Sequence, residues 1–280
     1  MEFLLRDDAH FSEEQWGKID ESVVKTARAS LIGRKFITIY GPLGAGVQSI
    51  NIDDFGVTEQ GEVDFFGDTD NDVAPVKTQG RRFVEIPMVY KDFYITWRDI
   101  ENSKQFGLPL DLASAAGAAA ICAKKEDELI FLGNAALGYE GLTTTAGSTR
   151  MTKKNWQEGE NSFNDIVKGL EILTEKGFVG KFALTVSPDL YMQLQRIQAN
   201  TGLLESDRIK SLLDGNLYQT PALGTNKAVL VCAEPQNLDL VIGQDLITGY
   251  LGSEKLNHVF RVLETILVRI KRKDAIVVFE

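Results

Sequence analysis

The C-terminal segment 257–280 constrains the fold of this chain more than any other stretch. It holds two runs rich in β-branched and aromatic residues, Phe260–Ile270 and Ala275–Phe279, with cationic residues between them. Runs of this composition are typical of buried strands, and neither contains a group suited to catalysis. The segment therefore predicts a chain end that pairs in a C-terminal sheet and is buried, and that performs no chemistry.

The composition is that of an ordinary globular protein and argues against several classes of function. The 280 residues suffice for one large domain or two of moderate size. No apolar run approaches the roughly 20 residues that cross a bilayer, and acidic residues stand where a secretory signal would be basic. We therefore expect a cytoplasmic protein with no membrane partner. The net charge of −10 argues mildly against a nucleic-acid partner, because phosphate binding needs clustered cations.

Cysteines and histidines are too few for the common catalytic and metal centres. Cys122 and Cys232 cannot build a disulfide framework or a four-ligand zinc site, and both lie in apolar stretches. His10 and His258 stand in separate polar contexts, which argues against a histidine metal centre or a Ser-His-Asp triad. The acidic residues 126–128 lack the Glu-x-x-His motif of di-iron proteins. The sequence predicts no enzyme activity and no metal site in this chain.

Residues 12–32 carry the clearest helical pattern. Ser12 and Gln15 have the spacing of a capping box, and Gly33 is placed to end the helix. Apolar residues then recur every three or four positions, which predicts one stripe along one helix face. The stripe consists of Trp16, Ile19, Val23, Ala27 and Leu31.

Residues 35–99 predict strands and a long polar excursion. Lys35–Tyr40 alternates like a strand, and the glycine-rich turn 41–46 has neither the dinucleotide spacing nor the Lys-Ser/Thr of a phosphate-binding loop. The acidic region 50–82 lacks the glycine and glutamate register of an EF-hand. So long an excursion is better explained by contacts between subunits than by a monomer. The pattern of 82–99 predicts a strand with Val84, Ile86, Met88 and Tyr90 on one face.

The remaining sequence predicts a long helix followed by a second lobe. Asp111 is the expected N-cap of an alanine-rich helix that ends at Gly133. From Leu137 to Leu240 helices and strands alternate. The predicted helices are 162–174, 188–198 and 205–213, and the predicted strands are 182–186, 228–232 and 238–242.

Several segments resemble the encapsulins, bacterial shell proteins with the fold of tailed-phage capsids. The resemblance runs in order along nearly the whole chain, through Met1–Phe3, Gly33–Phe36, Glu126–Phe131 and Gly243–Leu246. It implies an α+β, HK97-like capsid fold. The implied parts are the N-terminal helix and start of the P-domain at 1–47, the extended E-loop at 48–86, the P-domain with its spine helix at 87–136, the A-domain at 137–240, and the C-terminal P-domain strands at 241–280.

The resemblance also implies a function. An encapsulin is a self-assembling icosahedral shell, built from on the order of 60 copies or a multiple of that number, and it encloses cargo proteins that carry a C-terminal targeting peptide. The stretches IYGPLGAGVQ and KDF…WRDIE resemble the branch whose cargo is a ferritin-like iron oxidase. Iron storage and protection from oxidative stress are then expected, with the iron held by the cargo. The alternatives are a major capsid protein of a tailed phage or prophage, and a flavin-binding shell.

The resemblance assigns three candidate sites. Apolar groove residues would accept Leu or Ile side chains of the cargo peptide while Arg34 and Asp245 fix its register, although any of them could equally be core residues. Trp97 would bind flavin, or would simply pack as an aromatic residue at a domain edge. A neutral turn would line a five-fold pore without a strong charge filter. The groove residues are Leu31, Arg34, Phe36, Ile37, Asp245, Leu246, Ile247 and Tyr250, and the pore residues are Ala199, Asn200, Thr201 and Gly202.

Overall fold

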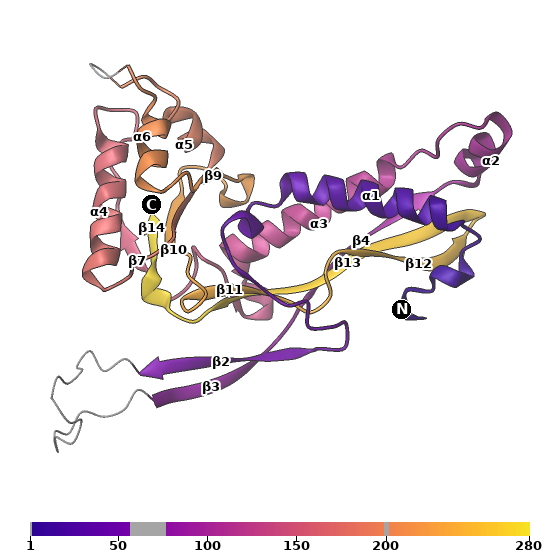
Figure 1. The fold of residues 1–280 in the computed structure, drawn as a ribbon, viewed down its shortest axis with the longest axis horizontal. Helices are drawn as coiled ribbons and strands as arrows, with labels where there is room; N and C mark the ends of the chain where they lie inside the picture. The colour runs from indigo at the N-terminus through magenta and orange to yellow at the C-terminus, as the bar shows by residue number, and fades with distance from the viewer. Residues whose placement is uncertain (1, 57–76, 199–201) are drawn as a thin grey trace.

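The computed structural model describes residues 2–56, 77–198 and 202–280, which form two lobes and a projecting arm (Figure 1). The first lobe is organised around the 14-residue strand β13 (Asn257–Ile270). Its first half pairs antiparallel with β12 (Ile247–Glu254) on one side and β4 (Met88–Ile95) on the other. Its second half pairs with β11 (Leu238–Ile242), and β1 (Ile39–Tyr40) extends that side in parallel.

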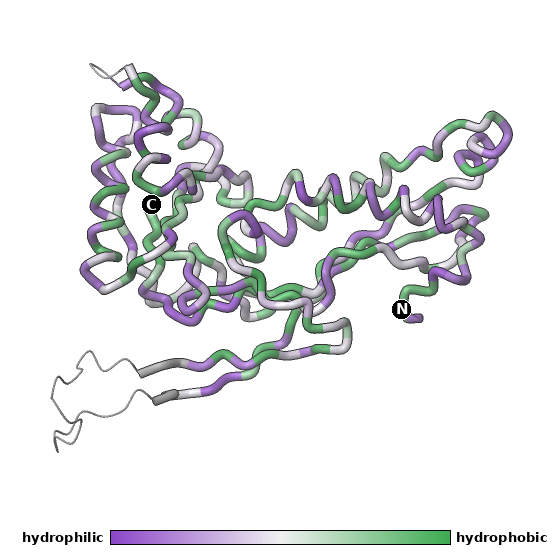
Figure 2. The backbone as a smooth tube through the Cα atoms, viewed as in Figure 1, coloured by the Kyte–Doolittle hydropathy of each residue, from purple (hydrophilic) through white to green (hydrophobic). Residues whose placement is uncertain are grey.

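Two long helices cover one face of this sheet. The helices are α1 (Glu13–Ser30) and the spine helix α3 (Ala113–Leu132), and both lie on the side of the sheet opposite the arm (Figure 1). Hydrophobic and hydrophilic residues alternate along α1, as expected for a helix with one apolar face (Figure 2). The shared core includes Trp16, Ile19, Phe131, Phe260 and Val262. A short helix, α2 (Trp97–Phe106), lies at the far end of this lobe.

The second lobe has its own five-stranded sheet and its own core around Trp156, Leu184 and Phe279. The strand order is β7 (Thr149–Met151), β14 (Ile276–Phe279), β10 (Ala228–Cys232), β8 (Phe182–Val186) and β9 (Leu217–Gln219). The helices are α4 (Asn161–Glu175), α5 (Pro188–Gln193) and α6 (Glu205–Leu212). A two-residue pair, β5 (Gly133–Asn134) and β6 (Tyr139–Glu140), follows the end of α3. The 3₁₀ helices are Glu2–Leu4, Arg6–Asp8, Gly33–Lys35, Ala135–Leu137, Pro221–Leu223 and Lys273–Ala275.

The arm is a two-stranded ribbon that leaves the first lobe on the open side of its sheet (Figure 1). It consists of β2 (Ser49–Gly56) and β3 (Lys77–Glu85), which pair only with each other in the part that the structure describes. A small cluster of Ile86, Val241 and Leu267 anchors its base. Residues 57–76 of the acidic region that was compared with an EF-hand lie outside the described residues.

The two C-terminal runs are both strands, but they do not pair with one another. The turn at Lys273–Ala275 carries the chain out of the first sheet, and β14 inserts between β7 and β10 of the second. All four of its residues are buried, as expected for a strand with neighbours on both sides. The predicted pairing in one C-terminal sheet is therefore wrong, and segment 241–280 contributes strands to both lobes.

Several predicted elements differ at their ends. Only Ile39–Tyr40 of the predicted strand 35–40 is extended, because a 3₁₀ turn precedes it and buries Phe36 and Ile37. Residue Leu112, not Asp111, is the N-cap of α3, although the Asp111 carboxylate accepts a bond from the Ala113 N–H. The helix that starts at Pro188 ends at Gln193, well before the predicted 198.

The strand face predicted for 82–99 is wrong beyond Pro87. Pro87 separates β3 from β4, and the alternation changes phase there. Val89, Phe93 and Ile95 are buried, while Met88 and Tyr90 are about half exposed. Beyond Ile95, a Thr96 side chain that accepts a bond from the Asp99 N–H starts helix α2, which the β-like pattern did not predict.

Candidate functional site

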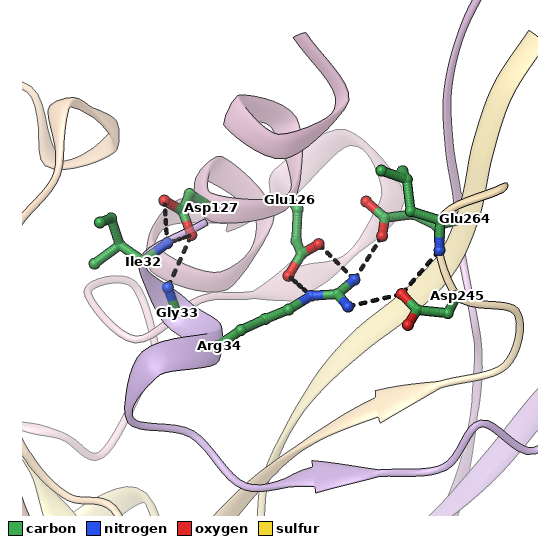
Figure 3. A network of polar contacts seen from close by, with 8 residues as sticks. Ile32, Gly33, Arg34, Glu126, Asp127, Asp245 and Glu264 are labelled. Atoms are coloured by element: carbon green, nitrogen blue, oxygen red, sulfur yellow. Dashed lines mark hydrogen bonds and ion pairs between the residues drawn. The ribbon is translucent and has the colours of Figure 1, made fainter. Parts of the chain in front are cut away.

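The chain that leaves α1 is fixed to the spine helix by Asp127. The capping box of Ser12 and Gln15 is present at the start of α1. At its other end the backbone N–H groups of Ile32 and Gly33 donate to the Asp127 carboxylate over 3.1 and 2.9 Å (Figure 3). Burial raises the pKa of Asp127 to about 6, against the opposing effect of these two donors.

Arg34 follows directly and binds three carboxylates from three other segments (Figure 3). Its Nε and Nη2 donate to both oxygens of Glu126 on α3, each over 2.8 Å. Nη2 also donates to Glu264 on β13 and Nη1 to Asp245 before β12, each over 2.7 Å. Arg34 thus connects the end of α1, the spine helix and the β12–β13 hairpin.

The carboxylates at this junction differ in their exposure to water. Glu126 and Glu264 are fully buried, whereas the side chain of Asp245 is 55% exposed. Burial raises the pKa of Glu264 well above its ordinary value, and the neighbouring Glu126 charge raises it further. Burial acts to lower the pKa of Arg34, but the three carboxylates outweigh it and keep the guanidinium charged.

The structure brings only part of the predicted groove together. Arg34, Asp245, Leu246 and Leu31 meet at the junction, where Leu246 packs on a small cluster with Leu31. Phe36 lies apart, stacked on Tyr218. The buried residues are Leu31, Phe36, Ile37 and Tyr250, and the half-buried residues are Leu246 and Ile247.

Strand alternation separates two further groove residues. The side chain of Tyr250 packs in the core beneath α1, and side chains along a strand point to alternate faces. Ile247 therefore lies on the opposite face of β12. At the junction Asp245 is exposed, and Leu246 beside it is half-buried.

A hollow of about 530 Å³ lies along the first turns of α1, which the sequence did not indicate. At its side Arg6 pairs with both oxygens of Asp20, over 2.8 and 2.7 Å, and its guanidinium lies 4.5 Å from the centre of the Trp16 ring. The lining residues are Arg6, Asp7, Ala9, Phe11, Glu13, Trp16, Gly17 and Asp20. The hollow therefore lies between the N-terminal 3₁₀ turn and the start of α1, at the other end of this helix from the junction.

The structure describes the predicted pore turn only in part, and it describes the predicted flavin site at Trp97. Residues Ala199, Asn200 and Thr201 lie outside the described residues, and Gly202 is exposed with a left-handed φ of 69°. The chain on either side of this turn is held by the Arg196–Glu205 ion pair of 2.7 Å. Trp97 begins α2 and is 44% exposed, with the Arg98 guanidinium 5.5 Å from its ring centre.

The described residues offer no metal-binding group and no activated thiol. Among residues 2–56, 77–198 and 202–280, no three His, Cys, Asp or Glu side chains are grouped to hold a metal ion. Both cysteines are buried, and burial raises the pKa of the Cys122 thiol to about 12. No helix in the described parts of the chain is long and apolar enough to span a bilayer.

Apolar side chains are exposed on the arm and on the open face of the first sheet. Phe83 on β3 is 74% exposed, and Met88, Tyr90 and Tyr94 on β4 are each about half exposed. Both outer edges of the β2–β3 ribbon lack a neighbouring strand among the described residues. Exposed apolar rows beside unpaired strand edges are typical of surfaces that another chain covers.

The sequence relatives identify the family. The profile of the family described as encapsulating protein for peroxidase matches residues 1–267. The type 1 encapsulin shell protein EncA of Myxococcus xanthus is 44% identical over 279 residues, covering 100% of this chain and 96% of that protein. The chain belongs to the encapsulin shell proteins. A diheme-cytochrome–encapsulin shell fusion protein of Kuenenia stuttgartiensis is 38% identical, covering 99% of this chain and 75% of that protein.

The solved structures agree on the fold. The virus-like particle of Pyrococcus furiosus matches with a TM-score of 0.78 at 23% identity, covering 96% of this chain and 100% of that one. The capsid of Myoviridae phage XM1 matches with a TM-score of 0.61 at 13% identity, covering 88% of this chain and 90% of that one. The predicted HK97-like capsid fold is confirmed. The encapsulin sequence match, and not the fold, favours a shell protein over the phage capsid alternative.

Proposed function

We propose that copies of this encapsulin close into an icosahedral shell around a cargo enzyme, and that the shell protein itself has no catalytic centre. With on the order of 60 copies of 31.0 kDa, the smallest such particle has a mass of about 1.9 MDa. The arm carries this proposal. A two-stranded ribbon is marginally stable alone, and β2–β3 projects with Phe83 exposed, so that a second copy is the natural partner for it.

The cargo peptide is proposed to dock on the α1 side of the junction. Leu246 offers apolar surface for a Leu or Ile side chain, and the exposed Asp245 beside it favours a cationic neighbour in the peptide. The hollow at the first turns of α1, at the other end of this helix from the junction, is lined by the carboxylates of Asp7, Glu13 and Asp20. Arg34 is already bound to three carboxylates, so in this proposal it supports the surface and does not contact the peptide.

The proposed cargo is a ferritin-like iron oxidase, which would make the particle an iron store that protects against oxidative stress. A relative from Pyrococcus furiosus, 27% identical over 205 residues, is a ferritin-like–encapsulin shell fusion protein. The Kuenenia relative is fused to a diheme cytochrome, which makes a haem protein the second candidate class of cargo.

The first test is the particle mass of the protein expressed alone, measured by light scattering with negative-stain imaging. Hollow megadalton particles are expected, and a stable monomer or dimer would contradict the shell. The second test co-expresses a fluorescent protein that carries the C-terminal peptide of a ferritin-like iron oxidase. Fluorescence should co-purify with the particles, and the same fluorescent protein without the peptide is the control.

A further inference from the structure

The junction around Arg34 holds more negative charge than its single guanidinium can balance. Glu126 and Glu264 are both fully buried and both approach the same nitrogen, Nη2, over 2.8 and 2.7 Å. Asp245 is half exposed, so water can compensate its charge. Two ionised carboxylates buried against one cation would leave one charge without a partner, which is costly in a protein interior.

One carboxyl oxygen at this junction lacks a hydrogen-bond partner. Glu264 Oε1 is buried and accepts no bond, although the Glu126 carboxyl is its neighbour on α3. A carboxylate has no hydrogen to donate, whereas a protonated carboxyl donates one O–H. A proton on Glu264 would turn this orphan oxygen into a donor to Glu126 and would remove the excess charge in one step.

Among the described residues, Arg34 is the cation that acts on Glu264, and the other groups nearest to it are acidic or apolar. Arg34 is its cationic contact, and the carboxylates of Glu126 and Asp245 face it from α3 and from the segment before β12. The Cys122 thiol of α3 lies within the electrostatic reach of Glu264 and is un-ionised, and the charges of Lys91 and Asp92 on β4, which are opposite in sign, act on the same thiol. Opposite Glu264 on β4 is the apolar Val89.

We infer that Glu264 holds a proton that it donates to Glu126, and that this acid pair with Arg34 positions the Asp245–Leu246 segment for cargo-peptide binding. The only chemical step is the reversible release of that proton to solvent. When the proton leaves, two buried carboxylates repel each other across Arg34. The end of α1 and the β12–β13 hairpin are then no longer held in one position relative to each other. This inference rests on the proposed docking surface. Glu126, Glu264 and Arg34 are positioning residues in it, not peptide contacts.

The direction of the pH effect follows from the raised pKa of Glu264. A carboxyl whose pKa is higher in the folded chain binds its proton more tightly there than in the unfolded chain. Its contribution to stability is complete below the ordinary carboxyl pKa and is lost as the pH rises through the raised value. Alkaline solution should therefore loosen the junction.

The test compares assembled wild-type particles with Glu264→Gln particles from about pH 6 to about pH 9. The amide cannot ionise and still offers an N–H to Glu126. Affinity for a fluorescent-labelled C-terminal peptide of a ferritin-like iron oxidase should fall at least about tenfold across this range for the wild type, and by much less for the variant. Glu128→Gln on α3, whose partly buried carboxylate pairs with the exposed Lys124 and Lys125, is the control and should behave as the wild type. Parallel pH profiles of wild type and Glu264→Gln would overturn the inference.

Two further readouts keep the inference separate from the proposed function. Thermal unfolding of the same particles tests the acid pair without the peptide, because alkaline solution should destabilise the wild type more than Glu264→Gln. A lack of peptide binding at every pH would contradict only the docking proposal. If Glu264→Gln fails to assemble, infrared spectroscopy of wild-type particles decides. A protonated-carboxyl band that persists as the pH rises past the Asp127 pKa of about 6 supports the pair, and a carboxyl band that titrates wholly with Asp127 overturns it.

Discussion

Asp127 accepts a 2.9 Å hydrogen bond from the backbone N–H of Gly33, a contact that joins the end of the N-terminal helix to the spine helix 94 residues later in the chain. Asp127→Ala should lower stability by about 1–3 kcal/mol, because the buried N–H of Gly33 and the partly buried N–H of Ile32 lose their acceptor. Thermal unfolding of the purified particles measures this loss. An unchanged midpoint would mean that water or another group replaces the carboxylate.

The same residue predicts a pH dependence on the acid side. The pKa of Asp127 is raised to about 6, chiefly by burial. The contribution of the raised Asp127 pKa to the free energy of unfolding is therefore largest below the ordinary carboxyl pKa of about 4. It is lost as the pH rises to about 6. Asp127→Asn should remove this part of the profile, so wild type and variant should differ in slope between about pH 4 and about pH 6. Identical slopes would assign the pH dependence to other groups.

Phe83 predicts which surface of the arm another copy covers. It projects from β3 opposite Asn51, next to the exposed Arg81–Asp53 ion pair. Phe83→Ala removes an aromatic side chain worth about 1.5–3 kcal/mol when fully buried, and that loss repeats at every contact of the shell. The fraction of chain in particles should fall, as measured by light scattering. Ser49→Ala on the same ribbon is the control, and equal assembly of both variants would exclude Phe83 from the contact.

Trp97 provides the test for a bound flavin. Its ring is partly exposed at the start of α2, beside the guanidinium of Arg98. If flavin binds there, purified particles should be yellow and fluorescent, and Trp97→Ala should remove the colour while leaving the particles intact. Colourless wild-type particles from cells supplied with riboflavin would leave Trp97 as an aromatic residue that packs at the edge of the lobe.

Sequence patterns correctly predicted those elements whose boundaries are marked by residues only a few positions apart. The capping box of Ser12 and Gln15 gave the start of α1 correctly because both partners belong to the same turn. Helix α2 was missed because it buries little beyond Ile100, although Thr96 and Asp99 have the spacing of a cap. Strand β12 was missed because Gly249 and Gly252 weaken its β-like pattern.

The junction around Arg34 depends on ion pairs between residues far apart in sequence, which patterns within a few residues cannot predict. The partners of Arg34 lie 92, 211 and 230 residues away in sequence. The sequence did contain one indication of this junction, however. Glu264 shares the inward phase of Phe260, Val262 and Ile266 on β13, and a charged residue in a buried register predicts a buried partner. The identity of that partner required the fold, as did the placement of Ile247 and Tyr250 on opposite faces.

The end of the spine helix predicts a site that tolerates no side chain. A Cβ on Gly141 would lie 2.5 Å from the backbone carbon of Leu132 and 2.7 Å from its nitrogen, closer than real atoms approach. Backbone atoms cannot rotate away, and the bonds from Leu142 N–H to Ile130 O and from Thr143 N–H to Phe131 O hold this crossing together. Gly141→Ala should therefore cost more than about 3 kcal/mol, at the upper end of overpacking effects. Gly117→Ala on the exposed side of α3 meets nothing within 4 Å and should instead stabilise the helix by about 0.5–1 kcal/mol. Thermal unfolding of the two variants should shift in opposite directions, and a Gly141→Ala protein as stable as the wild type would show that the two segments do not approach as closely as described.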